Sequence, residues 1–82
     1  MILKMYAMKD ELNGFTPPIP FPSDEIAKRY LKDQVETNPT IKISPEDFSI
    51  YYLGEYDTEL GRMIPNENKL IERARAYAKD YV

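Results

Sequence analysis

The N-terminal residues predict a buried strand. Residues 2–8 are apolar except for Lys4, and the charged and turn-forming residues 10–14 follow directly. A short apolar run that is bounded by a turn is typical of a strand covered on both faces. We therefore expect a central strand over residues 2–9.

The next segment is dominated by proline. Four prolines occupy the six positions 17–22, and proline cannot donate a hydrogen bond to a sheet. We expect an extended, polyproline-like crossover that lies over the core, anchored by the apolar side chains between the prolines. A second interpretation makes the segment a docking site for a protein partner. The residues that would contact such a partner are Phe15, Pro17, Pro18 and Phe21.

A helix follows over residues 24–37. Ser23 is a favourable N-cap, and two acidic residues in the first turn complement the helix dipole. Asn38 and Pro39 end the helical pattern. The apolar stripe of this helix consists of Ile26, Ala27, Tyr30, Leu31 and Val35. After the helix, apolar and polar residues alternate briefly over residues 40–43, which predicts an edge strand or an anchored loop.

The second half of the chain predicts a hairpin and a final helix. Residues 44–47 have the composition of a single helical turn, with proline at its first position, and residues 48–56 are rich in strand-forming residues. Residues 57–61 form a hairpin loop that ends in glycine, and residues 62–64 return as a strand until Pro65. Asn66 or Asn68 then caps a helix whose stripe is Leu70, Ile71, Ala74, Tyr77, Ala78 and Tyr81.

These elements predict an α+β fold. Their order is β-α-(β)-β-β-α, which favours a small antiparallel sheet of about three strands with two helices packed on one face. At 82 residues the chain has room for one core only, so we expect a single domain over residues 1–82.

Composition adds an expectation of self-association. So short a chain buries little surface, and it has neither cysteine for disulfides nor histidine, the commonest transition-metal ligand. We therefore expect a homodimer or a higher homo-oligomer. The net charge of −3 argues against a strongly basic nucleic-acid binder without excluding a local basic patch. We expect no membrane span, and the absence of cysteine fits a cytosolic protein.

Catalytic and metal chemistry are not indicated. The chain lacks the histidine and cysteine of common nucleophilic sites, and no serine, threonine or lysine constellation replaces them. The loop from Asp57 to Gly61 resembles the start of a calcium loop, but Arg62 stands where that loop requires glycine. We expect no enzyme activity, no catalytic or metal-binding residues and no cofactor.

The aromatic strand at 48–56 is the most suggestive feature. Phe48, Ile50 and Tyr52 project to one face, whereas Tyr51 and Leu53 project to the other. Because the helices cover one face only, an apolar patch remains. A second subunit would cover this patch through Tyr51 and Leu53. Alternatively, single-stranded DNA would stack there, and the candidate DNA-binding residues are Lys4, Lys42, Tyr51 and Arg62.

The order of motifs resembles a phage family. Residues 10–15 (DELNGF), Pro17-Pro18, the helix, residues 45–48 (PEDF) and residues 53–57 (LGEYD) follow one another. This succession is similar to the small non-structural protein of gokushovirus-type microviruses, which are single-stranded DNA phages. Here Ile19 and a further proline depart from the family's usual F-x-P-P-F.

The resemblance implies a protein of the host bacterial cytoplasm that is absent from the virion. It further implies a role in replicating or packaging a single-stranded DNA genome, with single-stranded DNA as a candidate ligand. The alternative is a protein-interaction module that binds a phage replication or scaffolding protein, or a host factor, without contacting DNA. Its surface would be the proline-rich segment together with the acidic loop around Asp57.

Overall fold

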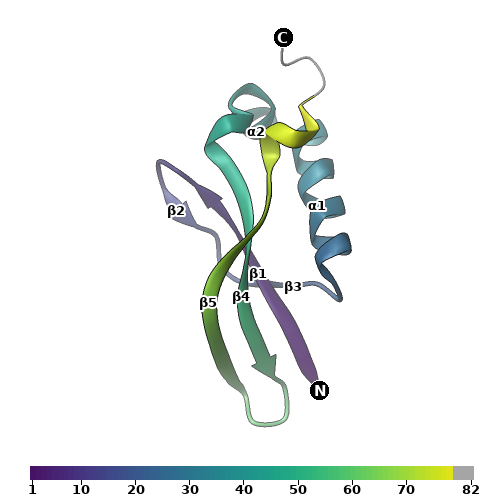
Figure 1. Ribbon diagram of the computed structural model, residues 1–82, viewed down its shortest axis with the longest axis vertical. Helices are drawn as coiled ribbons and strands as arrows, with labels where there is room; N and C mark the ends of the chain where they lie inside the picture. The colour runs from purple at the N-terminus through teal and green to yellow at the C-terminus, as the bar shows by residue number, and fades with distance from the viewer. Residues whose placement is uncertain (79–82) are drawn as a thin grey trace.

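The computed structural model describes residues 1–78 and has one antiparallel sheet with helices on one face (Figure 1). The sheet has five strands, in the order β2-β1-β4-β5, and β3 also pairs with β1. The strands are β1 (Ile2–Asp10), β2 (Gly14–Phe15), β3 (Ile19–Pro20), β4 (Phe48–Asp57) and β5 (Arg62–Arg73). The helices are α1 (Asp24–Thr37) and α2 (Pro39–Ile43), with the short 3-10 turns η1 (Pro45–Asp47) and η2 (Ala74–Tyr77).

Strand β1 is the central strand that its apolar run predicts. It pairs with β4 along one edge and with β2 and β3 along the other. Its four middle residues, 5–8, are buried, so both of its faces are covered there. The strand prediction is confirmed, with one further residue at the C-terminal end.

The proline-rich segment lies along the edge of β1. Thr16 N donates to Met8 O at 2.8 Å, and Phe21 N donates to Lys4 O at 3.1 Å. Residues next to the prolines thus supply the donors that proline lacks. The segment therefore pairs with the edge of the sheet instead of crossing over the core, and it protects that edge from pairing with other chains. The expected anchoring is confirmed for Phe21, which packs against the core.

Helix α1 has the boundaries that its sequence predicts. The Ser23 side chain accepts a hydrogen bond from Ile26 N, and Asn38 forms the C-cap. Ala27, Leu31 and Val35 are buried against the sheet. Local capping signals and one apolar stripe were sufficient here because they agree with each other.

Residues 39–43 form a helix, so the prediction of an edge strand or loop there is wrong. Asn38 also serves as the N-cap of α2, and its side chain accepts from Thr40 N at 3.0 Å. Pro39 occupies the first turn of α2, where its missing N–H has no helical partner to lose. The helical turn predicted at 44–47 is confirmed as η1.

The predicted C-terminal helix is wrong, because β5 continues well past Pro65. Leu70 pairs with Tyr51, and Arg73 pairs with Ser49. Strand β4 presents backbone N–H and C=O groups along ten residues, and pairing with β5 gives these groups hydrogen-bond partners. This pairing overrides the local helical pattern. Only η2 remains helical, and Tyr81 lies outside the described residues.

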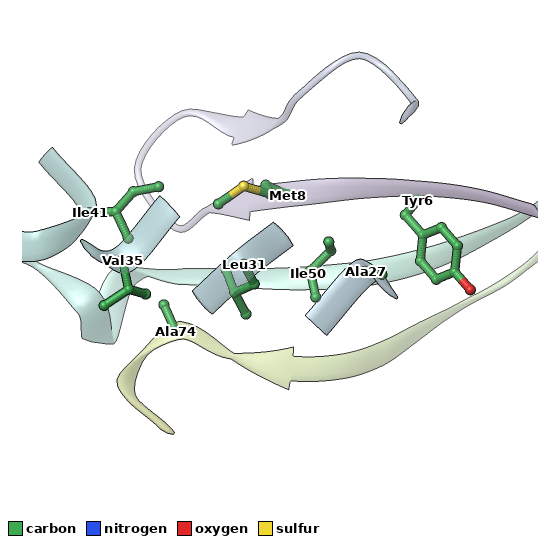
Figure 2. Close-up of a cluster of buried hydrophobic side chains, with 8 residues drawn as sticks. All are labelled: Tyr6, Met8, Ala27, Leu31, Val35, Ile41, Ile50 and Ala74. Carbon is green, nitrogen blue, oxygen red and sulfur yellow. The ribbon is translucent and has the colours of Figure 1, made fainter. Parts of the chain in front are cut away.

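One core lies between α1 and the sheet. Figure 2 shows its side chains gathered there, from both helices, from strands β1 and β4, and from η2. They are Tyr6, Met8, Ala27, Leu31, Val35, Ile41, Ile50 and Ala74. Phe48 and Tyr52 pack against this core, as the alternation of β4 predicts. The α+β class is confirmed, whereas the sheet has five strands instead of about three, and the second helix is α2.

The buried phenol of Tyr6 makes stability sensitive to alkaline pH. Its hydroxyl donates to Asp24 Oδ1 at 2.6 Å, and burial, then this contact, raise the pKa of Tyr6 above its ordinary value of 10.0. Above that value the unfolded phenol ionises while the folded one stays neutral, so the free energy of unfolding falls as pH rises.

We expect the urea midpoint to fall between about pH 9 and pH 11, and to fall less in Tyr6→Phe. Burial also raises the pKa of Tyr77. This group gives the wild type and Tyr6→Phe the same additional dependence of stability on pH. Equal slopes in the two proteins would contradict this assignment to Tyr6.

Candidate nucleic-acid interface

The face of the sheet opposite α1 carries two cross-strand rows of side chains. Directly opposed residues lie on the same face, and the pairings place Phe15, Lys9, Ser49 and Arg73 in one row. The neighbouring row on this face contains Ala7, Tyr51 and Leu70. We call Lys9, Phe15, Tyr51 and Arg73 together the platform.

The two aromatic rings of the platform contact each other edge to face. The ring centroids of Phe15 and Tyr51 are 5.4 Å apart, with an interplanar angle of 77°. The hairpin formed by β1 and β2 brings Phe15 over Tyr51, which is half-buried as a result, while Phe15 stays 44% exposed. The platform therefore offers a solvent-accessible ring on a rigid β-sheet support.

A cation lies directly beside both rings. The Lys9 ammonium is 5.7 Å from the ring centroid of Phe15 and 5.9 Å from that of Tyr51. Arg73 is exposed at the other end of the row. Lys9 Nζ also lies 3.7 Å from Glu11 Oε2, so one carboxylate partly neutralises this end of the platform.

The carboxylates of strand β4 lie on the opposite face. Glu55 pairs with Lys4, and Asp57 pairs with Ile2; these residues of β1 share the face of Tyr6, which packs beneath α1. Asp57 also caps its own hairpin loop, because its Oδ1 accepts from Glu59 N and Leu60 N. The carboxylates of Glu55 and Asp57 therefore do not face the platform.

The four DNA-binding candidates from the sequence do not come together. Tyr51 belongs to the platform. Lys4 lies on the α1 side, where it lines a concave surface of about 640 Å³ with Tyr52 and Lys69. Lys42 is exposed on α2, and Arg62 begins β5 at the hairpin end of the molecule.

The self-association and docking candidates are also dispersed. Leu53 is half-buried at the bulge between β4 and its neighbours. Pro17 and Pro18 are exposed on the edge of the sheet, whereas the Phe21 ring contacts those of Tyr6 and Tyr30. Asp57 caps the distant hairpin loop, so Phe21 and Asp57 do not form one surface.

Sequence reasoning missed Lys9 and Arg73 as members of this face. Lys9 alternates with the buried Met8, so the period of two in β1 already placed it opposite the core. Arg73 gave no comparable signal, because it lies within the C-terminal helix that the sequence predicts and outside its apolar stripe.

Comparison with protein families identifies the chain. The sequence profile of the phage ORF5 protein family matches residues 3–77. The chain belongs to this family. The ORF5-family protein is thus a phage protein, and its match covers every strand and helix except the first residue of β1. Comparison with curated proteins and with solved structures gave no match.

The described residues of the ORF5-family protein show neither a metal-binding cluster nor a membrane-spanning helix. Among residues 1–78, no group of three or more His, Cys, Asp or Glu side chains is placed to hold a metal ion. No helix in the same range is long and apolar enough to cross a membrane. In the described chain, the platform combines two aromatic rings in edge-to-face contact with one cation, Lys9, that lies over both.

Proposed function

We propose that this phage protein binds single-stranded DNA through the platform, as a non-structural accessory factor in genome replication or packaging. The observation that carries the proposal is the Lys9 ammonium beside the rings of Phe15 and Tyr51. The sequence resemblance to gokushovirus-type microviruses supports a single-stranded DNA ligand and a place in the host cytoplasm, outside the virion.

The residue types match what single-stranded nucleic acid requires. Bases stack on aromatic rings whatever their sequence, and cations beside the rings neutralise the backbone phosphates. The row Phe15–Lys9–Ser49–Arg73 spans four adjacent strands, about 4.8 Å apart. It therefore extends for roughly 14 Å, which is sufficient for two or three nucleotides.

The test is a titration of a fluorescently labelled oligothymidine of about 20 nucleotides. With few cations in contact, binding should be weak at about 50 mM salt and should fall steeply by about 200 mM. The absence of binding at about 100 μM protein and low salt would overturn the proposal. That outcome would favour the alternative, a module that binds a phage replication or scaffolding protein or a host factor.

Substitutions on the platform should separate stacking from phosphate contacts. We expect Phe15→Ala to weaken binding by about 1–3 kcal/mol. Its control is Leu12→Ala, which removes a more exposed side chain (82%) from the same hairpin. Arg73→Gln should reduce the slope of log affinity against log salt by about 0.7, with Arg29→Gln on the outer face of α1 as its control.

Glu11 provides a test in the opposite direction. Because its carboxylate lies 3.7 Å from Lys9, Glu11→Gln should strengthen binding to the oligonucleotide. Lys42→Gln tests the cation set that the sequence suggested, and the platform predicts no effect from it. A loss of affinity in Lys42→Gln equal to that in Arg73→Gln would contradict the platform.

A further inference from the structure

Three strands extend beyond the end of α1 and form an arm. The arm comprises residues 2–5 of β1, residues 54–57 of β4 and residues 62–65 of β5, with the hairpin loop between the last two (Figure 1). Only Met5 and Gly54, at the inner end of the arm, are buried, and the other arm residues are half-buried or exposed. A small β-sheet without a covered hydrophobic face is marginally stable in water, and the outer part of the arm lacks the packing that stabilises the rest of the sheet.

The two faces of the arm have opposite compositions. The pairings place Leu3, Tyr56 and Met63 in one row, and Met5, Gly54 and Pro65 in the next row on the same side. These six positions carry no charge, and we call them the arm face. The reverse face consists of Ile2, Lys4, Glu55, Asp57, Arg62 and Ile64. Such alternation is typical of a sheet with one buried and one solvated face.

The outer part of the arm face is nevertheless open to solvent in the single chain, whereas Met5 and Gly54 at its inner end are buried. Met63 is 40% exposed, while Leu3 and Tyr56 are half-buried. The arm face and the platform lie on the same side of the sheet, because Leu3 and Lys9 alternate with the core-facing residues of β1. Their nearest rows, those of Met5 and Ala7, are two residues apart along β1, about 7 Å, whereas Leu3 and Lys9 are about 20 Å apart.

We propose that a second copy of this chain packs on the arm face, so that two arms bury their uncharged sides against each other. The charge distribution favours a second copy as the occupant. The cationic groups of the arm are Lys4, Arg62 and the Met1 ammonium, and they balance the carboxylates of Glu55, Asp57 and Glu59. Two copies of a chain with a net charge of −3 repel each other least where they meet through a neutral segment.

The same balance disfavours other partners at this surface. A nucleic acid requires net positive charge on the face that it contacts, and the arm face has no charged residue. A strongly charged protein partner would likewise gain nothing from a neutral arm. The contact is small, so it belongs to the class of interfaces below about 1,200 Å² in total, and the dimer should form reversibly in the micromolar range.

The experiment is sedimentation velocity between about 5 and 500 μM protein. We expect the wild type to pass from the 9.6 kDa monomer to a dimer and Met63→Lys to remain monomeric. Ile64→Lys is the matched control, because Ile64 is 39% exposed on the reverse face of the same strand, and it should dimerise like the wild type. Far-UV circular dichroism verifies that both variants fold.

Three outcomes would overturn the proposal: a monomeric wild type at 500 μM, a dimer in Met63→Lys, or equal loss of the dimer in both variants. Because the chain has no cysteine, cross-linking gives a second measurement that does not depend on a disruptive substitution. Met63→Cys should cross-link between chains on mild oxidation much faster than Ile64→Cys. Equal rates would also overturn it.

This proposal is independent of DNA binding. Met63→Lys leaves the platform residues unchanged, so it should bind a short oligonucleotide of about 6 nucleotides like the wild type. A dimer that fails to bind DNA would therefore refute the platform alone, and a monomer that binds DNA would refute the arm contact alone.

Discussion

Replacing Gly54 with alanine should destabilise the protein by about 2–6 kcal/mol, since backbone strain and overpacking each cost about 1–3 kcal/mol. Gly54 has a φ of +139°, a conformation that is open mainly to glycine. A Cβ atom there would lie 2.4 Å from Ile64 O and 2.9 Å from Asn66 N. Both are backbone atoms, so strand β5 would have to move away from β4.

The cause of this close approach is a large bulge. Tyr52 pairs with Lys69 and Gly54 pairs with Pro65, so three residues of β5 stand opposite the single residue Leu53. The glycine allows the two strands to resume their pairing beyond this irregularity. Gly54→Ala should therefore weaken the arm first, and the arm contact between two copies should be lost with it.

Gly14→Ala is the matched control for this substitution. Gly14 also has a positive φ, of +90°, but an added Cβ would meet nothing within 4 Å. It should cost only the backbone strain, about 1–3 kcal/mol. Urea denaturation measures both free energies of unfolding, and equal losses would show that the contact with β5 is not the cause.

Replacing Leu31 with alanine should cost about 2–5 kcal/mol. Leu31 is fully buried at the centre of the core, between α1 and strands β1 and β4 (Figure 2). Its loss removes apolar contacts and leaves a cavity that the helix and the sheet cannot close without moving apart. Stabilities of small domains are near the lower end of about 5–15 kcal/mol, so much of the folding free energy would be lost.

Lys32→Ala is the control within the same helix. Lys32 is exposed and follows Leu31 directly, so its removal should change the free energy of unfolding by less than about 0.5 kcal/mol. Thermal unfolding by circular dichroism compares the two variants. A Leu31→Ala protein within 1 kcal/mol of the wild type would mean that the core repacks around the gap.

Elements with agreeing local signals were predictable from the sequence. Helix α1 has an N-cap, an apolar stripe and a C-terminal stop, and its observed boundaries match the prediction. The hairpin loop ending at Gly61 was also predictable, because its turn chemistry is local: Gly61 N donates to Asp57 O at 2.8 Å. Helix α2 also has a local signal, because Asn38 is the C-cap of α1 and the N-cap of α2, but an Asn-Pro pair by itself predicts only the end of a helix.

The candidate site was predictable only in part. The alternation of β4 placed Tyr51 opposite the core, which the structure confirms. It could not show that Phe15 covers this ring or that Lys9 lies beside both, because these contacts depend on how the first hairpin pairs. Uninterrupted alternation would place Glu55 and Asp57 on the face of Tyr51, whereas the bulge at Leu53 shifts the register and moves both to the other face.

The sequence by itself therefore determined the α+β class, helix α1, strands β1 and β4, and the sharp turn between β4 and β5. Each rests on interactions among neighbouring residues, which a local pattern records. Tertiary structure alone decided that residues 66–73 extend β5 instead of forming a helix, because the open edge of β4 offers them hydrogen bonds that no local pattern reveals. It also decided which charges accompany Tyr51, because the cross-strand register, shifted at Gly54, sets the partners of every side chain on the sheet.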